Sequence, residues 1–286
     1  MANKTSSKKT IIILLTVVFL IISIVTSAII YLNARNNAKE NLYFAILCDD
    51  PKDVDAILDK YPSLVHAEKI NFFKYFFSFS NSNSRPLLYA VDYGSLETVK
   101  TLVEHGAIVD LGFRRLPLIE AIKKNRFDIA WFLIESGADI SETDSTEWEE
   151  NVLFSLVSHK IESKDDYEIE QESFQLFKYV IEQGIPLAPP VGGSYGIHNI
   201  LGYAAYNNHS LAVKYLLDES IIDIDSNDDY LNRTPLICAV ENQSYDTCII
   251  LLDYGADRTL KDVNGKKALD YAIELNDEKL IEMLSE

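Results

Sequence analysis

The chain has 286 residues, of which 48% are hydrophobic and 24% are charged, a composition that excludes a disordered or collagen-like protein. Its 26 basic and 44 acidic side chains give a formal net charge of −18, which argues against binding of nucleic acid phosphates. This acidic surface favours a basic protein partner, although the same charge also aids solubility. Cys48, Cys238 and Cys248 form no metal-binding pattern, and so few cysteines suit either a reducing compartment or a bacterial periplasm.

The first element in chain order is the uncharged apolar run Ile11–Leu32 (IIILLTVVFLIISIVTSAIIYL). As a helix this run spans about 33 Å, enough to cross a hydrocarbon core of about 30 Å. A cleaved signal peptide is the alternative, but its apolar stretch normally has only about 7–15 residues, and the poor cleavage sequence at 26–28 lies inside this run. We therefore predict a transmembrane signal-anchor helix over residues 11–32.

The charges that flank the apolar run predict its orientation in a membrane. Three lysines lie within residues 1–10, whereas Arg35 and Lys39 follow the run. Under the positive-inside rule, residues 1–10 form a cytoplasmic tail and residues 33–286 lie across the membrane. The predicted localisation is that of a single-pass type II protein, with its main domain on the periplasmic side of a bacterial inner membrane.

The rest of the chain repeats one pattern. Three stretches, 85–110, 116–140 and 233–260, contain Pro-Leu, a small residue three positions after that leucine, and a leucine-rich run closed by Gly-Ala. The small residue serves as a register mark, found at Ala45, Ala90, Ala121, Ala204, Ala239 and Ala272. The residue twelve positions after each mark is apolar. Such a fixed offset predicts stacked pairs of short helices.

Residues beside the predicted helices suit helix ends. N-cap candidates for the second helix lie five residues after four of the marks, at Asp50, Ser95, Ser244 and Asp277. Glycines sixteen residues after three marks, at Gly106, Gly137 and Gly255, suit the left-handed conformation that closes a helix.

This pattern resembles the ankyrin repeat, whose T-P-L-H-x-A motif begins the first of two helices. The sequence of Thr234–Ala239 (TPLICA) lacks only the histidine of that motif. The turns at 229–236 and 262–269 resemble the family's D-x-x-G-x-T-P-L, with Asn232 replacing glycine in the first.

The resemblance implies an all-α ankyrin-repeat solenoid of about seven helix-turn-helix repeats over residues 33–286, preceded by the transmembrane helix. A degenerate repeat is expected at Asn151–Leu156, with its second helix at Ser173–Gln183. Insertions are expected at about 69–85, 160–172 and 185–197.

The first insertion holds a phenylalanine cluster, formed by Phe72, Phe73, Phe76 and Phe77. The cluster could dock a partner or fold over the first repeat as a cap. We expect capping because exposed apolar patches of this size are rare on stable monomers.

Residues that could carry catalysis show no recognisable spacing. No two histidines lie at helical spacing among His66, His105, His159, His198 and His209. The motifs HExxH, GxSxG and the P-loop do not occur. The acidic run 223–229 lacks the glycine and glutamate of a calcium-binding EF-hand loop, and Cys238 and Cys248 are expected to be inert thiols. We predict no enzymatic activity, no catalytic residue, no metal and no cofactor.

The main functional candidates form a row just before the register marks, at Phe44, Tyr89, Glu120, Ser155, Tyr203, Cys238 and Tyr271. In the ankyrin family this position tends to face the concave groove, which binds partners together with the turn tips. Tyr93 and Tyr206 lie close by on the same predicted helices, and Asp92, Glu241 and Glu274 rim the row. The alternative is that these tyrosines pack between adjacent first helices.

The sequence thus predicts a membrane-anchored protein–protein interaction module. A protein partner, expected to be basic, would bind the groove and turn tips, and Ile11–Leu32 would contact the lipid bilayer; neither nucleic acid nor a small-molecule substrate is expected. The module would serve as a scaffold or protector of an envelope protein. One alternative is an immunity protein that neutralises a toxin, and another is an enzyme with its site in the insertions.

Overall fold

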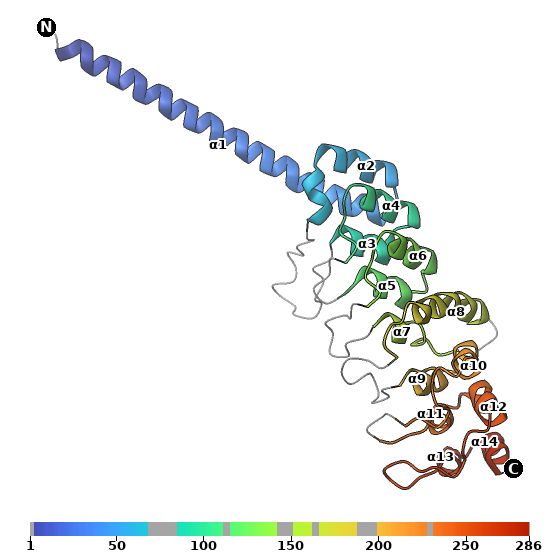
Figure 1. Ribbon diagram of the computed structural model, residues 1–286. Coiled ribbons are helices and arrows are strands. Elements are labelled where there is room, and N and C mark those ends of the chain that lie inside the picture. Colours follow the sequence, from blue (N-terminus) through green and yellow to red (C-terminus); the bar gives the residue numbers. More distant parts are fainter. Residues whose placement is uncertain are drawn as a thin grey trace. The chain divides into compact units, whose positions relative to one another are not determined.

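Figure 1 shows the computed structural model of the chain. The structure describes residues 3–67, 85–110, 115–141, 151–161, 166–187, 199–227 and 231–285, with side chains from residue 20 onward. Every regular element in these ranges is a helix, which confirms the predicted all-α class. The chain divides into two compact units, Met1–Ala107 and Ile108–Glu286.

The first unit contains two helix pairs and a short 3-10 helix. Its elements are α1 (Asn3–Leu47), α2 (Pro51–Lys60), η1 (Pro62–His66), α3 (Pro86–Tyr93) and α4 (Leu96–Glu104). Helix α1 packs against α2 and α3, and α2 packs against α4. The end of α1 is therefore the first helix of the first repeat.

The predicted apolar segment and this first repeat helix form one continuous helix. No glycine or proline precedes Asp50, so nothing in the sequence interrupts a helix before that point. Helix α1 accordingly runs for 45 residues. Side chains before Leu20 lie outside the described part of the chain, and within that part no helix has the length and apolarity needed to cross a membrane.

The second unit contains five helix pairs. Their elements are α5 (Pro117–Lys123), α6 (Phe127–Glu135), α7 (Val152–Ser155), α8 (Tyr167–Glu182), α9 (Ile200–Tyr206), α10 (Ser210–Asp218), α11 (Pro235–Glu241), α12 (Tyr245–Asp253), α13 (Ala268–Glu274) and α14 (Glu278–Ser285). The first helices α9, α11 and α13 lie side by side, as do the second helices α8, α10 and α12. The described residues of the two units together hold seven helix pairs, the number predicted.

The register alanines occupy equivalent buried positions. Their exposed fractions are 4% at Ala45 and 0% at Ala90, Ala121, Ala204, Ala239 and Ala272. The residue twelve positions later is also 0% exposed in four repeats, at Leu102, Leu133, Leu216 and Leu251. An alanine lets neighbouring helices approach closely, and leucine fills the remaining space at crystal-like packing density. The predicted repeat register is confirmed.

The turn between the two helices of a repeat has a recurring backbone shape. Four residues after the alanine, φ is positive, between 53° and 62°, at Asp49, Asn125, Asn208, Gln243 and Asn276. The next residue then donates its N–H to the alanine carbonyl over 2.9–3.1 Å. Asn and Asp tolerate the left-handed conformation better than most residues, so these turns carry a signal that is separate from the alanine register.

Three of the four predicted N-caps are confirmed. The side chains of Asp50, Ser95 and Asp277 accept backbone N–H groups of the helices that follow them. Ser244 lies at the predicted place but does not cap α12, because its Oγ donates to the carbonyl of Tyr206 over 2.6 Å. The turns before the last two repeats also show the expected positive φ, 58° at Asn232 and 75° at Gly265.

The degenerate fourth repeat differs from the prediction. Helix α8 begins at Tyr167, six residues before the expected start at Ser173, so part of the predicted insertion 160–172 is helical. Glu170 lies in these added turns, is only 5% exposed and accepts the Leu211 N–H over 2.9 Å, a contact that holds this part of the helix against α10. The phenylalanine cluster and most of the predicted insertions 69–85 and 185–197 lie outside the described residues.

Candidate partner-binding surface

In the second unit, three members of the predicted row are internal. Ser155, Tyr203 and Cys238 are 3%, 5% and 1% exposed. The Tyr203 ring lies 5.5 Å from the ring of Phe154 on the preceding first helix, centroid to centroid. These three side chains contribute to packing between helices and offer almost no surface to a partner.

Two other members of the row, and Tyr206 beside it, are held by polar contacts within the second unit. The Tyr271 hydroxyl donates to Asp262 Oδ2 over 2.7 Å, and burial together with this bond raises the pKa of Tyr271. The Glu120 carboxylate is paired with Arg115, and its side chain is only 12% exposed. Tyr206 is half-buried, and its carbonyl accepts hydrogen bonds from the next repeat.

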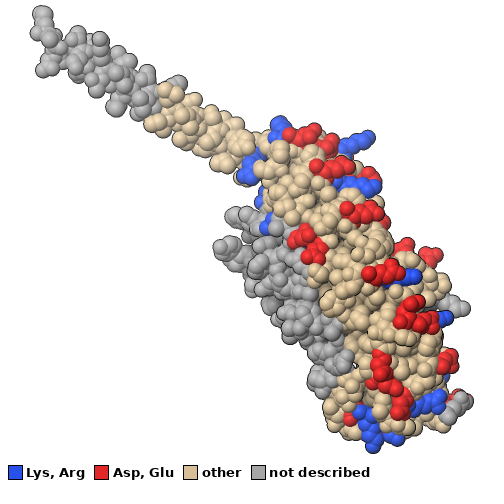
Figure 2. Space-filling model, in the orientation of Figure 1, with Lys and Arg blue, Asp and Glu red and all other residues tan. Residues whose placement is uncertain are grey.

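Two of the three acidic residues predicted to rim the row are already neutralised by basic side chains. Glu241 is paired with Arg233, whose side chain is 4% exposed, and Glu274 lies 2.7 Å from the Lys266 ammonium. Figure 2 shows the same mixture more widely, because basic side chains lie among the acidic ones on the face that it draws. In the second unit, therefore, these two carboxylates already have basic partners within the chain.

In the first unit the row and its neighbour Tyr93 are accessible. Phe44 is 66% exposed, Tyr93 is 57% exposed and Tyr89 is half-buried. Helix periodicity explains the exposure of Phe44, because Tyr43 and Ile46 on the same turn of α1 face inward and are 1% and 0% exposed. We call Phe44, Tyr89 and Tyr93 the aromatic surface.

The aromatic surface rests on a buried ring. Tyr43 lies edge-on to Tyr89, with 5.2 Å between ring centroids, and Tyr89 lies 4.7 Å from Tyr93. The Tyr43 hydroxyl donates to the Ala67 carbonyl over 2.6 Å, and this hydrogen bond holds the buried Tyr43 ring in place. Phe44 and Tyr89 also line one open hollow of about 340 Å³, together with Glu40, Asn41, Tyr43 and Leu47.

Buried ionisable groups in the second unit serve the fold. His209 is 2% exposed, its Nε2 bonds the His159 carbonyl at 2.6 Å, and burial lowers the pKa of His209 to about 4. The Glu170 carboxylate accepts the Leu211 N–H over 2.9 Å and thereby caps α10 from a neighbouring helix, while burial raises its pKa. Burial also raises the pKa of Cys248 to about 12, so this thiol is not ionised at neutral pH.

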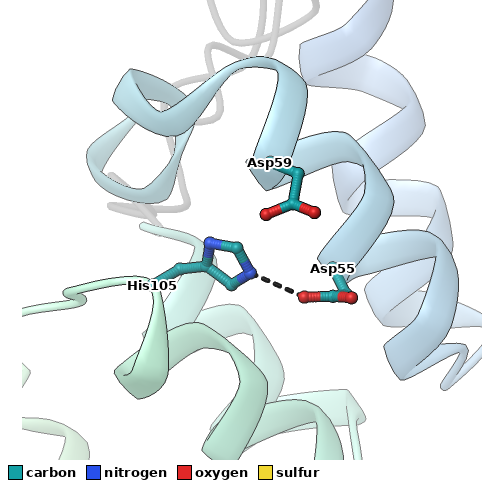
Figure 3. Close-up of side chains that lie close together, drawn as sticks. All are labelled: Asp55, Asp59 and His105. Atoms are coloured by element: carbon teal, nitrogen blue, oxygen red, sulfur yellow. Dashed lines mark hydrogen bonds and ion pairs between the residues drawn. The ribbon is translucent and has the colours of Figure 1, made fainter.

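The structure also brings His105 beside two aspartates that precede it by 50 and 46 residues in the sequence. Asp55 and Asp59 on α2 meet His105 at the end of α4 (Figure 3). Asp55 and Asp59 lie 10 and 14 residues after Ala45, and His105 lies 15 residues after Ala90. The three residues therefore occupy similar positions along the second helices of two adjacent repeats. The expectation that no metal binds rested on short sequence motifs, which cannot reveal a group drawn from two repeats.

Comparison with known proteins identifies the family. A family model described as ankyrin repeats in three copies matches residues 42–144, 170–262 and 201–286. The chain therefore belongs to the ankyrin-repeat family, and membership implies a protein-interaction module that binds protein partners.

Individual similarities agree with this assignment. The chain is 31% identical over 201 residues to a probable palmitoyltransferase, AKR2, of Saccharomyces uvarum. The match covers 67% of this chain but only 25% of that protein. The human ASB11 ankyrin repeat domain is similar in structure, with a TM-score of 0.61, 19% identity and coverage of 85% of this chain and 96% of that chain. This second similarity shows the fold alone.

Proposed function

We propose that the chain is a membrane-anchored module that holds a protein partner on the aromatic surface. One observation carries the proposal: Phe44 and Tyr93 are more than half exposed, Phe44 beside the hollow that Tyr89 also lines and Tyr93 in ring contact with Tyr89, whereas Tyr203 and Cys238 in the second unit are buried. Rigid aromatic side chains lose little conformational entropy on binding and are frequent anchors at interfaces.

The chemistry around the aromatic surface favours a partner with basic side chains set among apolar ones. Glu40 lines the hollow beside Phe44, and Leu47 adds an apolar side chain that is 51% exposed. An arginine or lysine of the partner would gain cation–π attraction of about 0.5–1 kcal/mol over an exposed ring and more once desolvated. The carboxylate of Glu40 would add attraction that weakens as salt is raised.

Membrane anchoring is supported by the exposed apolar surface of α1. Its side chains from Leu20 to Leu32 include nine large apolar ones that are 49–69% exposed, at Leu20, Ile21, Ile22, Ile24, Val25, Ile29, Ile30, Tyr31 and Leu32. In water, exposing apolar area costs about 25 cal/mol per Å², a cost that a bilayer removes. The flanking charges support an N-terminus in the cytoplasm and repeats on the opposite side.

The continuity of α1 links the two parts of the proposal. Phe44 lies twelve residues beyond Leu32 on the same helix, which is about 18 Å along the helix axis. The aromatic surface would therefore sit close to the membrane surface, where a membrane or envelope protein is the nearest partner. An immunity protein that neutralises a soluble basic toxin is the alternative, and capture of such a toxin would favour it.

A non-catalytic role fits the three cysteines of the chain. Acyl transfer through cysteine requires an accessible thiolate, and Cys238 and Cys248 are 1% and 0% exposed. Cys48 is exposed at the end of α1. We expect the purified chain to transfer no palmitoyl group from a palmitoyl thioester to a protein; transfer that requires Cys48 would instead make it an enzyme.

Affinity purification tests the proposed surface. The full chain in mild detergent should capture a partner, and Phe44→Ala with Tyr93→Ala should reduce capture more than tenfold because the exposed rings are lost. The matched control replaces Tyr167 and Ile273, which are 57% and 52% exposed on the second unit, with alanine. Equal capture by both double variants, with unchanged circular dichroism, would contradict the proposal.

A further inference from the structure

We infer that Asp55, Asp59 and His105 form a binding site for a divalent transition metal of the zinc type. The three residues offer two carboxylates and one imidazole, and their ligand atoms all lie within 4.8 Å of one another. Figure 3 shows the three side chains directed toward a common point between α2 and α4. We call this group the Asp-Asp-His cluster.

The backbone holds each ligand in place. Asp55 and Asp59 are four residues apart on α2, so both project from one face of that helix. The buried Val54 and Leu58, both 0% exposed, fix an adjoining face of α2 against the core of the unit. His105 is the C-cap of α4, where its N–H bonds the Thr101 carbonyl.

A hydrogen bond alone does not account for the arrangement. His105 Nε2 lies 2.8 Å from Asp55 Oδ1, which satisfies that pair. The carboxylate of Asp59 nevertheless lies within the same small space, and two like charges at this spacing repel each other. A divalent cation between them would neutralise both carboxylates and use the imidazole nitrogen as a third ligand.

The donor set selects the kind of metal. Imidazole nitrogen suits zinc, copper, iron and nickel more than calcium, magnesium or manganese, which prefer oxygen ligands. Zinc lies about 2.0–2.2 Å from nitrogen and oxygen ligands, so ligand atoms around one ion are about 3–3.5 Å apart. Small rotations of side chains that are 60% exposed at Asp55 and 18% exposed at His105 reach this spacing. At least one coordination position would remain for water.

Metal titration tests the inference on the full chain, purified in mild detergent without a histidine tag. Isothermal titration with Zn²⁺ should show one saturable site, and Co²⁺ should give visible absorption bands of a site with nitrogen and oxygen ligands. His105→Ala and Asp59→Asn should each weaken Zn²⁺ affinity more than tenfold. Bound Zn²⁺ should raise the melting temperature of the unaltered chain, because the metal joins α2 to α4.

Two control variants separate this site from weak surface binding. Asp53→Asn removes a carboxylate from the same helix but a different face, and His66→Ala removes an exposed histidine of the same unit. Both should leave Zn²⁺ affinity and the melting shift unchanged. The inference is overturned if the unaltered chain shows no saturable binding, or if Asp59→Asn and His105→Ala bind Zn²⁺ as tightly as the controls while circular dichroism shows them folded.

Discussion

At the scale of single residues, His209 is buried at a sequence position where a histidine is usually exposed to solvent. His209 falls in a turn between helices, a place where histidine is usually solvated, yet its ring is 2% exposed. It is enclosed because the polypeptide around His159 passes over it and accepts its hydrogen bond. This segment belongs to the degenerate repeat, whose altered spacing hides the contact from any repeat-based prediction.

The burial of His209 predicts an acid-sensitive fold. Its pKa is about 4 when folded and about 6.5 when unfolded, so the unfolded chain binds the extra proton between these values. Stability is therefore complete above pH 6.5 and falls by about 3 kcal/mol as the pH approaches 4. His209→Gln should flatten this dependence, as measured by urea unfolding at several pH values. Glu170 and His159 remain in both proteins, so the difference isolates His209; parallel pH profiles would contradict it.

The solvent exposure of each candidate side chain could not be predicted from the sequence. The register identified equivalent positions in every repeat, and Phe44 and Cys238 occupy the same one. Phe44 is 66% exposed and Cys238 is 1% exposed, because Cys238 lies on α11, which is flanked by the first helices α9 and α13. Exposure depends on such neighbours, which periodicity within one repeat does not specify.

At the scale of elements, the turn between helices joins one repeat to the next. Asn208 has φ of 62°, accepts the Thr247 N–H over 3.2 Å and donates to the Ile161 carbonyl over 3.1 Å. Asp49 makes the same kind of link in the first unit, where its carboxylate accepts the Ser95 N–H over 2.7 Å. The turn residue with positive φ therefore has two roles: its backbone forms the turn of its own repeat, and its side chain accepts a backbone N–H of the next repeat.

Because Asn208 has both roles, its substitution should lower the free energy of unfolding more than substitution of a turn residue that has only the backbone role. Asn208→Ala removes these hydrogen bonds and places a non-glycine, non-Asx residue in a left-handed conformation, which should cost about 2–4 kcal/mol. Asn125→Ala is the matched control, because Asn125 has φ of 56° but its side chain makes no hydrogen bond within the described residues. It should cost only about 1–2 kcal/mol. Chemical denaturation of both variants measures the difference, and equal costs would refute the linking role of Asn208.

Most elements were predictable from the alanine register, the leucine offset and the helix caps. Those signals fix where helices begin and end because capping and close packing require particular residues at those points. The two departures have a physical reason. Helix α1 continues through the expected boundary because no helix-breaking residue occurs there, and α8 extends toward Tyr167 because Glu170 finds a backbone partner on α10.

At the scale of the whole molecule, Cys48 is a natural reporter of the proposed membrane orientation. It is the exposed cysteine of the chain, while Cys238 and Cys248 are buried. A membrane-impermeant maleimide should label the full chain in intact bacterial spheroplasts, and Cys48→Ser should abolish the labelling. Labelling that appears only after lysis would place the repeats in the cytoplasm and reverse the proposed orientation.

Site-specific photo-crosslinking in living cells shows whether the partner binds on the aromatic surface. A benzophenone amino acid in place of Phe44 should give a discrete crosslinked product, lost when Tyr89→Ala and Tyr93→Ala are added. The same probe in place of Tyr167, also more than half exposed, should give no such product. Crosslinking to the same protein from both positions, or from Tyr167 alone, would mean that the partner does not bind specifically at the aromatic surface.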